Sequence, residues 1–142
     1  QELAEGRFQN AIAEVDSIPP DNVRRVVLCS GKVYYDLLEA RRKADNKEVA
    51  IIRIEQLYPF PEEELKVIMQ DYQHVTDFVW CQEEPKNQGA WYNCQHRMKR
   101  VIPDKVYLNY VGRPASAAPA VGYMSLHLQQ QKALVEEALT IE

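Results

Sequence analysis

Cysteine and histidine are scarce in this 142-residue sequence, with three of each. The cysteines are odd in number, none belongs to a Cys-x-x-Cys pair, and two stand in apolar runs, so no disulfide framework is expected. The histidines lack metal-ligand spacing to one another or to a cysteine pair. These residues are Cys29, Cys81, Cys94, His74, His96 and His127. Their pattern predicts no metal site and favours a reducing cytosol.

Long apolar runs and an excess of basic charge are also missing. No window approaches the ~20 apolar residues needed to cross a bilayer, and no signal-peptide pattern opens the chain. The sequence has 17 basic and 21 acidic side chains, a net charge of -4, which argues against a nucleic-acid binder. Neither Gly-x-x-x-x-Gly-Lys-Ser/Thr nor Gly-x-Gly-x-x-Gly occurs. We therefore expect neither nucleic acid nor a membrane as a partner.

The composition that is present fits one globular domain. Apolar residues make up 46% of the chain, which at this length supports a hydrophobic core without disulfides. Residues 1–10 form a largely polar stretch that starts without methionine, so we interpret them as the remnant of an interdomain linker. The domain itself is assigned to residues 11–142, and the chain is predicted to be a fragment of a longer protein.

Apolar runs typical of strands alternate with helical patterns along the domain. The predicted strands are 11–15, 26–29, 49–54, 78–81 and 106–111, and the predicted helices are 31–44, 61–72, 88–100 and 124–139. This alternation predicts a three-layer α/β/α sandwich around a largely parallel sheet. The first run reaches the second through Pro19-Pro20, without room for a crossover helix. The first strand should therefore be antiparallel or non-adjacent. The packing positions predicted for the last helix are Met124, Leu128, Val135, Ala138 and Leu139.

The turn Cys29-Ser30-Gly31-Lys32 joins a buried strand to a helix. Backbone N–H groups and a lysine at such a place can hold a phosphate or a carboxylate, which makes Ser30 and Lys32 candidate anion contacts. A tight turn in which Ser30 caps the helix is the favoured interpretation, because capping serines are common at helix starts.

Glu83 and Glu84 follow a predicted parallel strand, at the end where α/β sheets place ligands. Paired carboxylates there could perform acid–base chemistry. Adjacent residues on an extended segment point to opposite faces, however, so the two are not expected to share a proton. The favoured interpretation is that one of them faces solvent and the other caps or pairs with a neighbouring element.

Small residues dominate the segment 112–122, which also contains two prolines and two glycines. This composition excludes a continuous helix and allows close packing, so we expect an ordered loop pressed against its own domain or a partner. Arg113 is the best candidate for a bidentate anion contact, with a structural salt bridge as the alternative. The candidate interface residues are Trp91, Tyr92, Arg113, Ser116 and His127. For Trp91 and Tyr92, core packing is an equally open alternative.

Four ordered blocks together resemble the C-terminal end of the thiamine-dependent, decarboxylating component of the 2-oxoglutarate dehydrogenase complex. The blocks are 27–36, 54–61, 80–91 and 112–122, and the similarity continues through Ser125-Leu126-His127. The most specific of them is Arg-Pro-Ala-Ser-Ala-x-Pro-Ala-Val-Gly. The resemblance implies a transketolase C-terminal-like fold, with a five-stranded mixed sheet whose first strand is antiparallel.

The same resemblance implies a homodimeric parent enzyme of the tricarboxylic acid cycle. That parent would decarboxylate 2-oxoglutarate and pass the succinyl group to a lipoyl arm of the dihydrolipoyl succinyltransferase core, in a bacterial cytoplasm or a mitochondrial matrix. Its thiamine diphosphate and magnesium would lie in upstream domains, because the family's Gly-Asp-Gly motif is absent here. No catalytic, cofactor-binding or metal residue is therefore assigned, and the implied role is assembly.

Three alternatives stay open at this point. The parent could be a 2-oxoadipate dehydrogenase with the same domain. The chain could be a small α/β enzyme using Glu83 or Glu84, although no nucleophile–base pair is visible. It could also be a regulatory domain that binds an anion or a nucleotide through Ser30, Lys32 or Arg113.

Overall fold

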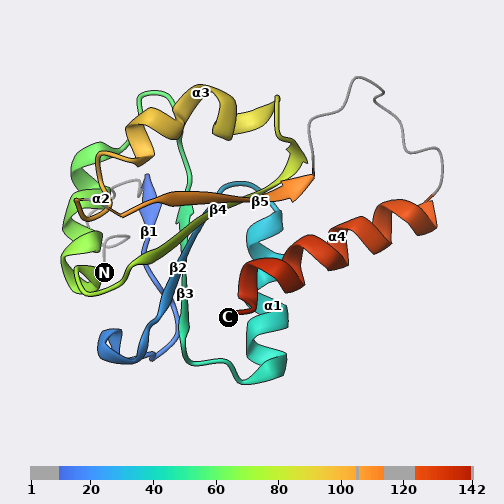
Figure 1. Ribbon diagram of the computed structural model, residues 1–142, viewed down its shortest axis with the longest axis horizontal. Coiled ribbons are helices and arrows are strands. Elements are labelled where there is room, and N and C mark those ends of the chain that lie inside the picture. The colour runs from blue at the N-terminus through green and yellow to red at the C-terminus, as the bar shows by residue number, and fades with distance from the viewer. Residues whose placement is uncertain (1–9, 105, 114–123, 142) are drawn as a thin grey trace, which may run out of the picture.

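The computed structural model describes residues 10–104, 106–113 and 124–141. Its centre is a five-stranded sheet in the order β1-β3-β2-β4-β5, shown in Figure 1. The strands are β1 (Ala11–Ile12), β2 (Arg25–Cys29), β3 (Val49–Ile54), β4 (Asp77–Pro85) and β5 (Leu108–Arg113). β1 pairs antiparallel with β3, and all other pairs are parallel. The predicted antiparallel first strand and mixed sheet are confirmed.

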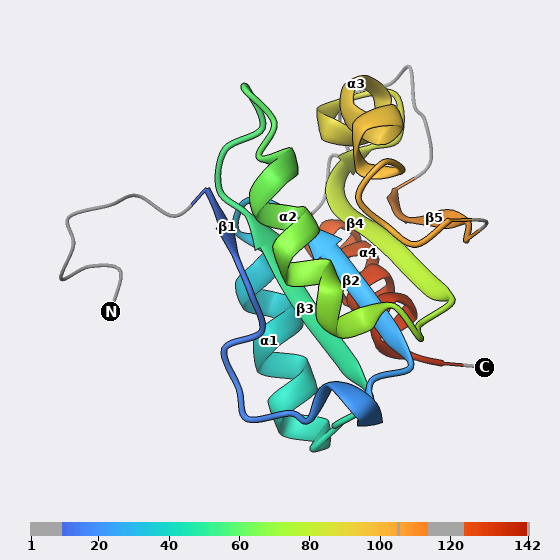
Figure 2. The same cartoon turned by 90° about the vertical axis from the view of Figure 1, so that its left-hand side faces the viewer.

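Helices cover both faces of the sheet, which confirms the predicted three layers (Figure 2). The helices are α1 (Val33–Ala44), α2 (Glu62–Met69), α3 (Gly89–Met98) and α4 (Met124–Leu139), with short 3-10 turns at η2 (Pro20–Asn22) and η3 (Gln70–Tyr72). α1 and α4 pack on one face, and α2 and α3 on the other. Each face has its own apolar core, because successive residues of the central strand β2 point to opposite sides.

The first strand ends at Ile12, earlier than the predicted 11–15, because after Ile12 side chains replace the backbone as hydrogen-bond partners of β3. The Glu14 carboxylate accepts the Ile51 N–H at 2.8 Å, and the Arg41 guanidinium donates to the Val49 carbonyl at 3.1 Å. Arg41 is 1% exposed and is paired with Glu14. A buried charge is tolerated only with such partners, so this ion pair satisfies the edge of β3 where backbone pairing stops.

The start of α1 also departs from the prediction that Ser30 caps it. Gly31 adopts a left-handed φ of +81°, and the helix begins at Val33 with Lys32 as its N-cap and no side-chain capping bond. The turn made possible by Gly31 separates Ser30 from the first helical N–H groups, so the capping prediction is wrong. At the other end, Asp45 closes the helix in a left-handed conformation, as the predicted stop at this position requires.

The last helix has the predicted bounds, and its packing is predicted only in part. Val135 and Ala138 are buried against the sheet, and Leu139 is partly buried. Leu128 is 58% exposed, so its predicted packing role within this domain is wrong. Figure 1 gives the reason, because the N-terminal half of α4 extends past the edge of the sheet and away from α1.

Candidate functional site

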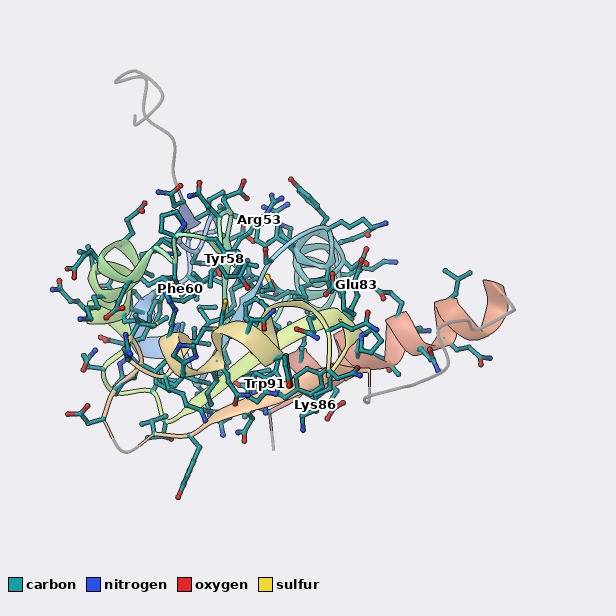
Figure 3. The ribbon with its side chains drawn as sticks, turned by 90° about the horizontal axis from the view of Figure 1, so that it is seen from above. Arg53, Tyr58, Phe60, Glu83, Lys86 and Trp91 are labelled. Atoms are coloured by element: carbon teal, nitrogen blue, oxygen red, sulfur yellow. The ribbon has the colours of Figure 1, made fainter. Side chains whose placement is uncertain are left out.

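The candidate site is the edge of the sheet where the parallel strands end, which we call the strand-end edge, seen from above in Figure 3. Ligands of open α/β sheets usually bind at this edge. Here it is formed by the ends of β3 and β4, the start of α1 and the helix α3, and it carries the labelled side chains of Arg53, Glu83 and Trp91.

The Gln82 amide organises this edge. Its side chain is buried, and Oε1 accepts the Trp80 indole N–H at 2.8 Å and the Trp91 backbone N–H at 3.0 Å. Nε2 donates to the carbonyls of Glu84, Pro85 and Gln88 at 3.0, 2.8 and 2.8 Å. One neutral amide therefore fixes the turn that leads from β4 into α3. Sequence reasoning missed this residue, although a polar side chain directly after the apolar run 78–81 was the available signal.

Two glycines allow the backbone to pass close to this amide. A Cβ on Gly112 would lie 2.5 Å from the Gln82 carbonyl oxygen and 2.6 Å from the Tyr110 hydroxyl. Gly89 has a φ of +70°, and a Cβ there would meet the Gln82 Oε1 at 3.2 Å. The strand pairing is irregular at the same place, between Gln82 and Pro85. Bulges and glycines of this kind are common where a strand ends beside a functional site or where another backbone segment approaches closely.

Arg53, at the end of β3, is a second residue that sequence reasoning missed. Its Nε lies 2.6 Å from Glu55 Oε2, and Nη1 donates to the Tyr35 hydroxyl at 2.8 Å. The guanidinium also lies over the rings of Tyr34 and Tyr35, at 5.1 and 4.9 Å. Its positive charge is therefore balanced and held within the domain.

The predicted anion turn lies beside Arg53, because Cys29 and Arg53 are register partners in β2 and β3. Lys32 is exposed and Ser30 is partly buried. Neither side chain makes a hydrogen bond or ion pair with a residue that the structure describes. The structure brings these two residues to the same edge as Arg53, and anion binding by them stays a prediction.

Glu83 and Glu84 occupy different surroundings. Gln131 of α4 donates to Glu83 Oε1 at 3.0 Å and to Asp36 of α1 at 2.9 Å, so Glu83 faces the α1 and α4 layer. Glu84 is exposed and lies on the α3 side, with its Oε1 3.2 Å from the Cβ position of Gly89. The two carboxylates point to opposite faces, as their adjacency predicts, and they do not form an acid–base pair.

The cysteines are buried in the core and are not reactive nucleophiles. Burial raises the pKa of Cys81 to about 12, and it raises the pKa of Cys29 well above 9. Cys94 is buried too, and its thiol contacts the Tyr58 hydroxyl at 3.6 Å. His96 is exposed on the opposite side of α3 from Cys94, so the two form no couple. The raised pKa keeps the thiols of Cys29 and Cys81 protonated, and a protonated thiol is neither a nucleophile nor a metal ligand.

The predicted interface residues fall in different places. Trp91 is 9% exposed and packs in the core, with its ring centroid 5.4 Å from that of Tyr110, whereas Tyr92 is 67% exposed. Arg113 ends β5, but its side chain lies outside the described residues. The Ser116 position and the His127 side chain also lie outside them.

Two features are absent from the described residues. Across 10–104, 106–113 and 124–141, no three His, Cys, Asp or Glu side chains are placed to hold a metal ion. Nor is any helix in these ranges long and apolar enough to span a membrane.

The family of the chain follows from its sequence relatives. Residues 1–139 match the family model described as 2-oxoglutarate dehydrogenase C-terminal. The chain belongs to this family. It is 64% identical over 139 residues to a 2-oxoglutarate dehydrogenase E1 component of Haemophilus influenzae, covering 98% of the chain and 15% of that protein. An E1 component of Azotobacter vinelandii is 54% identical over 144 residues, covering 99% of the chain and 15% of that protein.

The 2-oxoglutarate dehydrogenase C-terminal domain has the fold expected from the resemblance. A split-gene transketolase, described as an inactive beta4 tetramer, superposes with a TM-score of 0.59 over 94% of this chain and 44% of that chain, at 14% identity. At that identity the likeness shows the fold alone. Since the domain spans about 15% of its relatives' length, most of a full-length relative lies outside it.

Proposed function

We propose that the chain is the C-terminal assembly domain of a 2-oxoglutarate dehydrogenase E1 component and has no catalytic activity alone. The observation that carries this proposal is the make-up of the strand-end edge. A buried neutral amide, Gln82, organises the edge, the two glutamates face apart, and the thiols are buried. Such an edge is ordered enough to support a neighbouring surface, and its described residues include no carboxylate pair for acid–base chemistry and no exposed thiol.

The proposed parent is a thiamine-dependent enzyme of the tricarboxylic acid cycle. It decarboxylates 2-oxoglutarate and passes the succinyl group to the lipoyl arm of a succinyltransferase component. Thiamine diphosphate and magnesium would bind in its upstream domains, because the family's Gly-Asp-Gly motif does not occur in this sequence. We further propose a homodimeric parent in a bacterial cytoplasm, with Tyr92, Arg113, Ser116 and His127 as interface candidates and Ser30 and Lys32 beside the domain border.

The proposal is tested by deleting the domain from the longer protein. Carbon dioxide release from 2-oxoglutarate is measured with thiamine diphosphate and magnesium, and the subunit mass is followed by light scattering. The intact protein should release carbon dioxide, and the deleted protein should lose both this activity and the stable dimer. Full activity and an intact dimer after the deletion would contradict the assembly role.

A further inference from the structure

The charges of the sequence are unevenly distributed around α3. Residues 85–103 contain four Lys or Arg residues and no Asp or Glu. The rest of the chain has 13 basic and 21 acidic side chains, so the segment has a formal charge of +4 and the remainder has -8. A folded domain usually mixes the two signs over its surface, so this separation is a feature of α3 and its flanks.

The fold places these charges on the outside of the molecule. Ala90, Trp91, Cys94 and Met98 form the buried stripe of α3. The exposed residues on the other sides of the helix and directly after its end are Tyr92, Asn93, His96, Arg97, Lys99 and Arg100. Figure 1 shows α3 as an outer element of the fold, so these exposed side chains are accessible from outside the domain.

The basic charges are mostly not neutralised within the domain. Arg97 and Lys99 form no ion pair with any residue in the described ranges. Arg100 approaches Glu62 at 3.8 Å, but its side chain is 61% exposed, so solvent weakens this pair. Lys86 lies 5.3 Å from the Tyr110 ring centroid, which leaves its charge uncancelled.

The helix dipole does not account for this distribution. Basic residues in the last turn of a helix are favourable, which covers His96 and Arg97. Lys86 precedes the N-terminus of α3, where the dipole disfavours a cation. The dipole also gives no reason for the lack of acidic side chains on the exposed positions, where they would form stabilising pairs.

Exposed aromatic rings stand beside these charges. Tyr92 is 67% exposed, and Tyr58 is 63% exposed and contacts Cys94 of α3. This contact places Tyr58 beside α3. We use the name α3 basic surface for Tyr58, Tyr92, His96, Arg97, Lys99 and Arg100. Tyrosine and arginine are both enriched in protein–protein interfaces.

We propose that the α3 basic surface docks an acidic protein domain of the succinyltransferase component. This inference rests on the proposed function, which makes that component the acceptor of the succinyl group. Complementary charge is what a transient encounter of this kind needs, because it raises the association rate without a large buried area. A nucleic acid is disfavoured as the occupant, since the chain is acidic as a whole and the surface holds only a few charges.

The test uses the full-length E1 protein carrying Arg97→Glu and Lys99→Glu together. A matched control carries Lys43→Glu and Lys132→Glu, two exposed lysines of α1 and α4, and changes the net charge equally. Succinyl transfer to the purified succinyltransferase component is measured against its concentration. Decarboxylation with ferricyanide as electron acceptor is measured in parallel and needs no second component.

The α3 variant should raise the KM for the succinyltransferase component about tenfold, since it replaces two attractive contacts by repulsive ones. Its kcat and its ferricyanide activity should not change, and the salt dependence of the KM should become weaker. The milder pair Arg97→Gln and Lys99→Gln should give an intermediate KM, which separates docking from any loss of helix stability.

An unchanged KM, or an equal rise in the α1/α4 control, would overturn the docking proposal. So would binding of the wild-type protein to single-stranded RNA or to phosphatidylserine vesicles that the α3 variant abolishes, because the surface would then serve another class of partner. Failure of the proposed function is distinguishable, since the wild-type protein would then show no 2-oxoglutarate-dependent ferricyanide reduction.

Discussion

Replacing Gln82 by leucine tests whether one buried amide holds the strand-end edge together. The change keeps a side chain of similar size but removes the acceptor for the Trp80 indole and the Trp91 backbone N–H, both of which are buried. A buried donor left without a partner costs about 1–3 kcal/mol. The three carbonyls that Nε2 serves are only part-buried, so water can replace their bonds.

The added apolar contact of leucine offsets about 1 kcal/mol of this cost. We therefore expect Gln82→Leu to lower the free energy of unfolding by about 3 kcal/mol. In urea unfolding followed by tryptophan fluorescence, with a slope of about 2 kcal/mol per molar, the midpoint should fall by roughly 1.5 M. Gln129→Leu is the matched control, because Gln129 is exposed and bonds to no described residue. A midpoint shift for Gln82→Leu no larger than that of the control would refute the reasoning.

Three further outcomes follow from the same structure. In thermal unfolding, Gly112→Ala should destabilise the domain by about 3 kcal/mol, because the added Cβ would meet the Gln82 backbone and the Tyr110 ring. Gly31→Ala should cost only about 1 kcal/mol, because Gly31 has a positive φ but open space around it. Equal losses of stability for the two variants would count against the steric explanation. Hydrogen bonds from the α1 arginines hold the pKa of the Asp16 carboxyl far below its usual range, so its contribution to stability is present above about pH 3.9 and is lost as the pH falls below that value. The gap in Tm between wild type and Asp16→Asn should thus narrow from pH 5 to pH 2, and a constant gap would contradict this. The three buried thiols should not react with a thiol-specific dye at pH 8 in the native protein and should all react in urea; fast native labelling would show that the core is open.

The layers of the fold were predictable because they follow from local patterns. Continuous apolar runs mark the strands buried on both faces, and the Pro19-Pro20 connection excludes a parallel crossover from the first strand. The bounds of α4 could also be predicted from the sequence. The packing of α4 could not, because the sequence does not show that half of the helix extends beyond the sheet. Leu128 is exposed for this reason.

The features of the site that depend on distant contacts could not be predicted. The end of β1 is set by the Glu14 and Arg41 side chains, which are far apart in the chain and meet only in the fold. The role of Gln82 depends on Trp91 and on the turn into α3 lying within reach of its amide. The resemblance to a known family predicted the fold. It did not predict that the Arg53 guanidinium would pair with Glu55 and lie over the Tyr35 ring, and the local sequence gives no sign of these contacts.

The central claim is that this domain supports an enzyme whose chemistry lies elsewhere. The most direct measurement is carbon dioxide release from 2-oxoglutarate by the isolated 142-residue chain, with thiamine diphosphate and magnesium, beside the full-length protein. The account predicts no release above the uncatalysed background for the isolated chain and sustained release for the full-length protein. Sustained, thiamine-dependent release by the isolated chain would contradict it.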